Sequence, residues 1–228
     1  MIHTIKLNKR LLLWSIAIIL LISCSIGVYF GVKNANNAPY NGITIVLDAG
    51  HGGRDGGVVG ITSKVKEADI NLSITKILKK MLERRGYRVV LTRHNQNGLY
   101  GLATQGRKLK DMKARKKIIE DNHPDLVVSI HQNSYPLHTQ TGSQVFYSIG
   151  GTNEQASIVQ TQMNSQLPGT DRIAKKGDYY ILNCTKYNSI LVECGFLTTP
   201  EEEKLLIQES YQEKVAYAIL SGINFIFF

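Results

Sequence analysis

Apolar residues recur along this chain in two patterns that alternate. Short continuous apolar runs, typical of buried β-strands, occupy residues 43–47, 87–93, 125–130, 143–148, 179–182 and 189–192. Between and after these runs, segments with helical spacing or composition predict helices at 67–85, 107–121, 153–166, 200–206 and 211–225. This order predicts an α/β fold: a single domain with a mainly parallel, twisted sheet of about six strands and helices on both faces.

The first 33 residues have a different pattern. Lys6, Lys9 and Arg10 precede an uncharged run at 11–32 that is long enough to cross a bilayer as a helix. No polar stripe marks it as a core helix, and no small-x-small site before a polar stretch marks a cleaved signal peptide, so an uncleaved transmembrane helix is favoured. We expect a cytoplasmic basic tail (1–10), a membrane anchor or signal segment (11–32), a linker (33–42) and a domain exported from the cytoplasm (43–228).

The three cysteines leave several possibilities open. Leu21-Ile22-Ser23-Cys24 resembles a bacterial lipoprotein cleavage box, but the apolar run continues past Cys24, which argues against lipidation there. Cys184 and Cys194 could pair after export. Both lie in or near predicted strands, which favours two buried thiols that act as small apolar residues.

Composition and charge narrow the range of partners. A chain of 228 residues with 43% hydrophobic composition can bury one good core. The formal net charge of +9 suits an anionic polymer or a membrane surface, although a solvated basic face explains it equally well. There is no aromatic-rich basic strand and no zinc-finger spacing, so we expect no nucleic-acid partner.

Four polar residues occupy positions at which predicted strands end or the first helix begins. His51 follows the first strand, within a run of glycines, whereas His131 and Glu193 follow the third and the last strands and Glu67 opens the first helix. Ligands of open α/β sheets bind beyond the carboxyl ends of the strands, so these side chains are expected to converge. Two histidines and one carboxylate with an open fourth position form the ligand set of a catalytic zinc. The second carboxylate would then face the metal-bound water.

Each residue also has a simpler explanation. His51 could be incidental to a glycine-rich turn, the helix dipole favours Glu67 in a first turn, and His131 could bond a backbone carbonyl. Glu193 is harder to dismiss, because a carboxylate among apolar neighbours is costly to bury, and the raised pKa that burial causes suits a group that takes and returns a proton. The remaining histidines are expected to be incidental, in loops or in the tail: His3, His94, His123 and His138.

Five motifs lie along the chain in this order: Leu47-Asp48-Ala49-Gly50-His51-Gly52-Gly53, Glu67-Ala68-Asp69-Ile70-Asn71-Leu72, Leu91-Thr92-Arg93, Ser129-Ile130-His131-Gln132-Asn133 and Leu191-Val192-Glu193-Cys194-Gly195-Phe196-Leu197. In sequence and order they resemble the zinc-dependent N-acetylmuramoyl-L-alanine amidases of bacterial cell-wall metabolism, in their type-3 catalytic domain. The resemblance implies that His51, Glu67 and His131 bind Zn²⁺, that Glu193 is the catalytic carboxylate, and that Asn133 lines the substrate site. The resemblance also extends to Arg115, which matches a recurrent arginine of the family and is expected to support the site rather than to take part in the chemistry.

The chain is most similar to the spore-cortex, germination-specific members of that family. The spacing between His131 and Glu193 leaves no room for the helix that blocks the site in septum-splitting members, and cell-wall-binding repeats are absent. The sequence differs from the usual family pattern at 58–60 and at Thr199, and neither difference involves an expected metal ligand. The resemblance implies that the substrate is peptidoglycan, as glycan strands with stem peptides. It also implies that the protein is located at the cell envelope or between the forespore membranes. Without a blocking helix, we expect control by expression or by a regulatory envelope protein. Another zinc peptidase or deacetylase, or a non-catalytic wall-binding protein, is the alternative.

Overall fold

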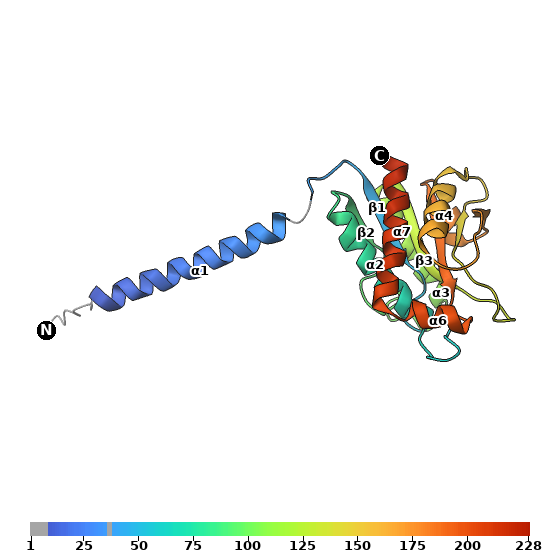
Figure 1. Cartoon of the computed structure of the whole chain (residues 1–228), viewed down its shortest axis with the longest axis horizontal. Coiled ribbons are helices and arrows are strands. Elements are labelled where there is room, and N and C mark those ends of the chain that lie inside the picture. The colour runs from blue at the N-terminus through green and yellow to red at the C-terminus, as the bar shows by residue number, and fades with distance from the viewer. Residues whose placement is uncertain (1–8, 36–37) are drawn as a thin grey trace. The chain divides into compact units, whose positions relative to one another are not determined.

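The structure, a computed structural model, describes residues 9–35 and 38–228, without the side chains of 11–13 and 27–35 (Figure 1). Contacts divide the chain into two units, Met1–Pro39 and Tyr40–Phe228. Most of the predicted basic tail, with His3, and part of the predicted linker lie outside the described residues.

The first unit contains one long helix, α1 (Lys9–Ala35). Described side chains along it, such as Trp14 and Leu21, are exposed. We predicted that residues 11–32 cross a membrane. In the described part of the chain, however, no helix combines the length and the apolar character that a crossing requires.

The second unit is built on a six-stranded sheet with the strand order β2-β1-β3-β6-β4-β5. Neighbouring strands run parallel except for β4 and β6, which are antiparallel. The predicted single α/β domain with a mainly parallel sheet is therefore confirmed. The strands are β1 (Thr44–Ala49), β2 (Arg88–Leu91), β3 (Leu126–Asn133), β4 (Gln144–Tyr147), β5 (Lys175–Lys176) and β6 (Ser189–Phe196).

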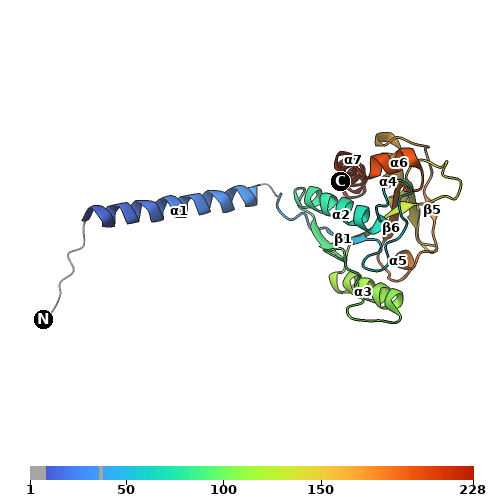
Figure 2. The same ribbon diagram turned by 90° about the horizontal axis from the view of Figure 1, so that it is seen from below.

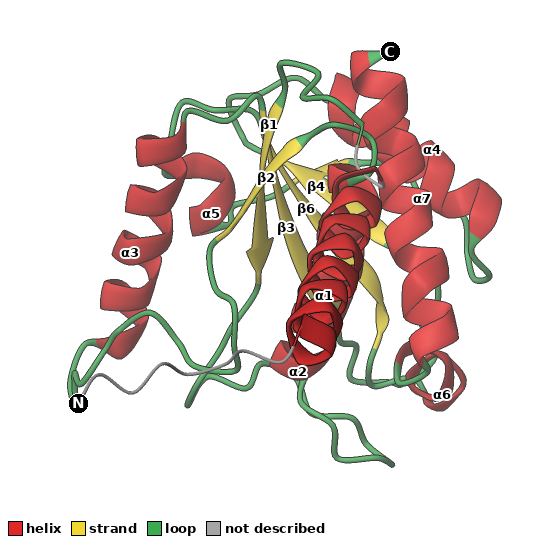
Figure 3. Ribbon diagram, turned by 90° about the vertical axis from the view of Figure 1, so that its left-hand side faces the viewer, coloured by secondary structure: helices red, strands yellow, loops and turns green. Residues whose placement is uncertain are grey.

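Helices cover both faces of this sheet, as predicted (Figures 2 and 3). The larger core lies under α2, α4 and α7, and the smaller one lies under α3 and α5. Successive strand residues alternate between the two cores: Ile45 and Leu47 of β1 join the larger one, and Val46 joins the smaller one. The helices are α2 (Glu67–Glu83), α3 (Arg107–Asn122), α4 (Glu154–Gln166), α5 (Tyr180–Asn183), α6 (Pro200–Leu206) and α7 (Glu209–Phe227).

Three details differ from the pattern-based prediction. The apolar run at 179–182 is not a strand; its last three residues lie in the short helix α5, where Ile181 and Leu182 are buried in the smaller core. Four apolar residues fit a buried helix turn as well as a strand, so their pattern alone cannot decide. The two-residue strand β5 has no apolar residue and was missed. Finally, β3 and β6 continue through His131 and Glu193 instead of ending before them.

A buried ion pair ties α3 to the sheet. Asp48 of β1 is 2% exposed and accepts hydrogen bonds from Ser129 Oγ (2.6 Å), Thr92 Oγ1 (2.7 Å) and the Arg115 guanidinium. Burial alone would raise the pKa of Asp48, but Arg115 and the two hydroxyls hold it at about 2. The carboxylate is thus ionised and fully paired between two neighbouring strands and a helix.

Removing the cation should leave that carboxylate buried and unpaired. We expect Arg115→Met to lower the free energy of unfolding by about 3–5 kcal/mol, measured by urea denaturation. Lys113→Met, at an exposed position of the same helix, should change it by no more than about 0.5 kcal/mol. Equal losses in the two variants would show that the pair does not hold α3 to the sheet.

Candidate active site

His51 lies in the turn that directly follows β1. Its backbone has a φ of 61°, in the left-handed region that non-glycine residues rarely adopt, and Arg115 Nη2 donates to its carbonyl oxygen at 2.6 Å. The preceding residue has to be glycine, because a Cβ on Gly50 would lie 2.3 Å from the ring of His131. The centroids of the His51 and His131 rings lie 5.0 Å apart, and the rings meet edge to face.

Glu67 opens α2, and its carboxylate is 2% exposed. Oε2 accepts from the backbone N–H of Val58 (2.8 Å), and Oε1 accepts from the backbone N–H of Gln132 (3.1 Å) and from Asn71 Nδ2 (3.2 Å). Burial alone would raise the pKa of Glu67, but the contacts with His131 and His51 hold it below its usual range. The buried carboxylate is therefore an anion.

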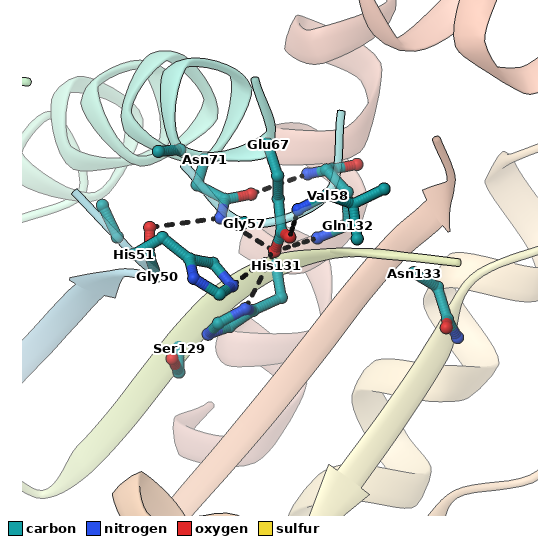
Figure 4. A network of polar contacts seen from close by, with 12 residues as sticks. Gly50, His51, Gly57, Val58, Glu67, Asn71, Ser129, His131, Gln132 and Asn133 are labelled. Atoms are coloured by element: carbon teal, nitrogen blue, oxygen red, sulfur yellow. Dashed lines mark hydrogen bonds and ion pairs between the residues drawn. The ribbon is translucent and has the colours of Figure 1, made fainter. Parts of the chain in front are cut away.

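The two imidazoles and this anion form one cluster (Figure 4). Glu67 Oε1 lies 3.0 Å from His131 Nδ1 and 3.3 Å from His51 Nε2. One ligand atom from each residue lies within 4.8 Å of the others, so the three could hold a metal ion. Two neutral imidazoles and one carboxylate are the donor set of catalytic zinc sites that keep a position open for water or substrate.

Glu193 lies beside this cluster. It is paired in register with His131 across β3 and β6, so the two side chains project from the same face of the sheet. The residue is 8% exposed, and Oε2 has no hydrogen-bond partner among the described residues. Burial raises the pKa of Glu193 to about 7, which suits a carboxylate that accepts and returns a proton near neutral pH.

The cluster and Glu193 line a cavity of about 700 Å³. Lys108 and Met112 of α3 line it, as do Asp178 and Tyr179 before α5. The structure therefore brings four predicted site residues together on its lining: His51, Glu67, His131 and Glu193.

The fifth predicted site residue, Asn133, lines the same cavity, but its side chain lies apart from the cluster (Figure 4). Its Oδ1 accepts from the backbone N–H of Ser134 at 2.8 Å. The histidines expected to be incidental, as far as the structure describes them, do not line the cavity: His94, His123 and His138.

A family model described as N-acetylmuramoyl-L-alanine amidase matches residues 45–224, which include the whole cluster. The chain belongs to this family. Its enzymatic class, amidase, is thereby shown as well.

The relatives of this amidase include one that is named germination-specific. The "Germination-specific N-acetylmuramoyl-L-alanine amidase" of Bacillus subtilis (strain 168) is 37% identical over an alignment of 192 residues, which covers 81% of this chain and 80% of the relative. The solved CwlD amidase from Clostridioides difficile, in complex with the GerS lipoprotein, has 37% identity and a TM-score of 0.77 over 80% of this chain and 96% of that one. The catalytic domain of CwlV from Bacillus (Paenibacillus) polymyxa var. colistinus has 29% identity and a TM-score of 0.72 over 81% and 97%. The resemblance to the family and to its germination-specific members is confirmed.

Several residues that shape the amidase site were not predicted from the sequence. Arg93 is 2% exposed and donates to the carbonyl oxygens of Ala49 (2.8 Å), Gly50 (3.0 Å) and Ala68 (2.7 Å), which joins the His51 turn to α2. Arg93 belongs to the motif Leu91-Thr92-Arg93, but the local pattern does not show that its guanidinium reaches these carbonyl oxygens. Asn71 does carry a local signal, because it lies one helical turn after Glu67 and the two side chains share a face of α2.

The tight fit at Gly50 gives a prediction for the amidase. We expect Gly50→Ala to push the His131 ring away, because the new methyl group would overlap it, and to lower kcat/KM by about 100-fold, as a misplacement of about 1 Å does. Zn²⁺ titration calorimetry should show weaker binding alongside the loss of amide hydrolysis. Gly150→Ala, where an added Cβ meets nothing within 4 Å, is the control and should match the wild type. Wild-type zinc binding by Gly50→Ala would contradict the assigned position of His131.

Proposed function

We propose that this enzyme is a zinc-dependent amidase. Its catalytic domain spans residues 43–228 and cleaves the amide bond between the lactyl group of N-acetylmuramic acid and the L-alanine of the stem peptide in peptidoglycan. The proposed ligands are His51, Glu67 and His131. The observation that carries the proposal is the cluster of two imidazoles and a buried carboxylate on the wall of one cavity, with a second carboxylate of raised pKa beside it.

The chain's own residues account for proton transfer and for binding. When bound, zinc supplies Lewis-acid chemistry that polarises a carbonyl group and acidifies water. Glu193 takes a proton from the attacking water as the new C–O bond forms at the scissile carbonyl. It returns the proton to the alanine nitrogen as the C–N bond breaks. Asn133 and the walls of the cavity bind the glycan and the peptide on either side of this bond.

The relatives support a more specific setting. Because one relative is named a germination-specific amidase, we propose that this enzyme acts outside the cytoplasm on spore-cortex peptidoglycan, during cortex maturation or germination. Because the CwlD amidase was solved in complex with the GerS lipoprotein, we also propose that an envelope protein regulates this enzyme.

The role of Glu193 separates metal binding from catalysis. We expect Glu193→Gln to bind Zn²⁺ like the wild type and to lose about 100- to 10,000-fold in kcat/KM, because the amide cannot carry the proton. His51→Ala should lose both properties. Zinc content, together with mass spectrometry of digested cortex peptidoglycan, measures the two effects. The exposed Glu201→Gln is the matched control.

Two outcomes of the same experiment would contradict the proposal. One is full activity of zinc-loaded Glu193→Gln. The other is a wild-type digest in which the new amine is not that of L-alanine or the lactyl group is not intact, which would indicate a peptidase or a deacetylase.

A further inference from the structure

A fully buried amide lies in the interior of α2. Asn71 is 0% exposed and lies one turn after Glu67. Burying an amide costs several kcal/mol unless it is hydrogen-bonded, and asparagine is a weak helix former. The position therefore calls for an explanation other than helix stability.

Three hydrogen bonds satisfy this amide (Figure 4). Asn71 Nδ2 donates to Glu67 Oε1 (3.2 Å) and to the carbonyl oxygen of Gly50 (3.3 Å). Asn71 Oδ1 accepts from Gln132 Nε2 (3.1 Å). A carboxylate and a carbonyl can only accept, so the two acceptors on one side and the donor on the other fix the orientation of the amide.

Each partner of this amide is a proposed metal ligand or the direct neighbour of one. Glu67 is a ligand, Gly50 precedes His51, and Gln132 follows His131. The three partners come from three segments: the start of α2, the turn after β1, and β3. In addition, the backbone N–H of Gln132 donates to the same Glu67 Oε1.

We propose that Asn71 is a positioning residue, whose single amide sets the three ligand-bearing segments relative to one another. The inference rests on the proposed metal site. Residues that orient metal ligands in this way are worth about 10- to 100-fold in metal affinity. The role requires both a donor and an acceptor. An aspartate here would place an oxygen against Glu67 Oε1 and the Gly50 carbonyl, and an alanine would leave all three partners without this contact.

The test measures zinc affinity of the full chain by competition with a chromophoric chelator, and the visible spectrum of the Co²⁺-loaded protein. We expect Asn71→Asp and Asn71→Ala to raise the Kd for Zn²⁺ about 10- to 100-fold and to change the Co²⁺ spectrum. Thr75→Val is the matched control. Thr75 is buried one turn further along α2. Within the described part of the chain, its hydroxyl group donates only to the backbone carbonyl oxygen of Asn71, at 2.7 Å. It should lose stability in urea with its zinc Kd unchanged.

A second variant keeps the test decisive where an Asn71 variant folds poorly. Gln132→Met removes the β3 partner and leaves Asn71 in place, and we expect it to raise the zinc Kd several-fold. Wild-type zinc affinity and an unchanged Co²⁺ spectrum in the Asn71 and Gln132 variants would overturn the inference, as would an equal rise in Kd for Thr75→Val. Failure of the wild-type protein itself to bind zinc would instead overturn the proposed function.

Discussion

The site depends on keeping one carboxylate, that of Glu67, ionised in a buried position. A charge in the protein interior is tolerated only when hydrogen bonds and counter-charges surround it. Glu67 obtains them from the loop before α2, from β3 and from α2 itself, and two imidazoles face it. These segments must therefore converge on one point. Glycines make the approach possible, since a Cβ at Gly57 would lie 2.4 Å from Glu67 Oε2 and one at Gly50 would overlap His131.

The cavity contains two buried glutamates with opposite properties. Glu67 has donors on both oxygens and a pKa below the usual range, whereas Glu193 has an oxygen without a hydrogen-bond partner in the described part of the chain and a pKa of about 7. Their environments separate them into an anionic ligand and a group that exchanges protons. A pair of titratable groups whose pKa values are pushed apart is a general feature of acid–base catalysis. The difference follows from their surroundings: the contacts with His131 and His51 lower the pKa of Glu67, whereas burial raises the pKa of Glu193.

Much of this arrangement was predictable from local patterns. Alternating strands and helices predicted the sheet, and the polar residues at strand ends led to His51, His131 and Glu193. The patterns were insufficient where the decisive contact is long-range. The ion pair of Asp48 and Arg115 joins residues 67 positions apart, and the junction of Asn71 with Gln132 depends on how β3 lies against α2. The prediction of a strand at 179–182 was wrong for a different reason, because four apolar residues do not distinguish a helix turn from a strand.

The most direct test of the proposed metal site is anomalous diffraction at the zinc absorption edge from crystals of the zinc-loaded protein. We expect a zinc peak at about 2.0–2.2 Å from nitrogen atoms of His51 and His131 and from a carboxylate oxygen of Glu67, with Glu193 outside the ligand set. A zinc peak elsewhere, or one with Glu193 as a ligand in place of Glu67, would contradict it.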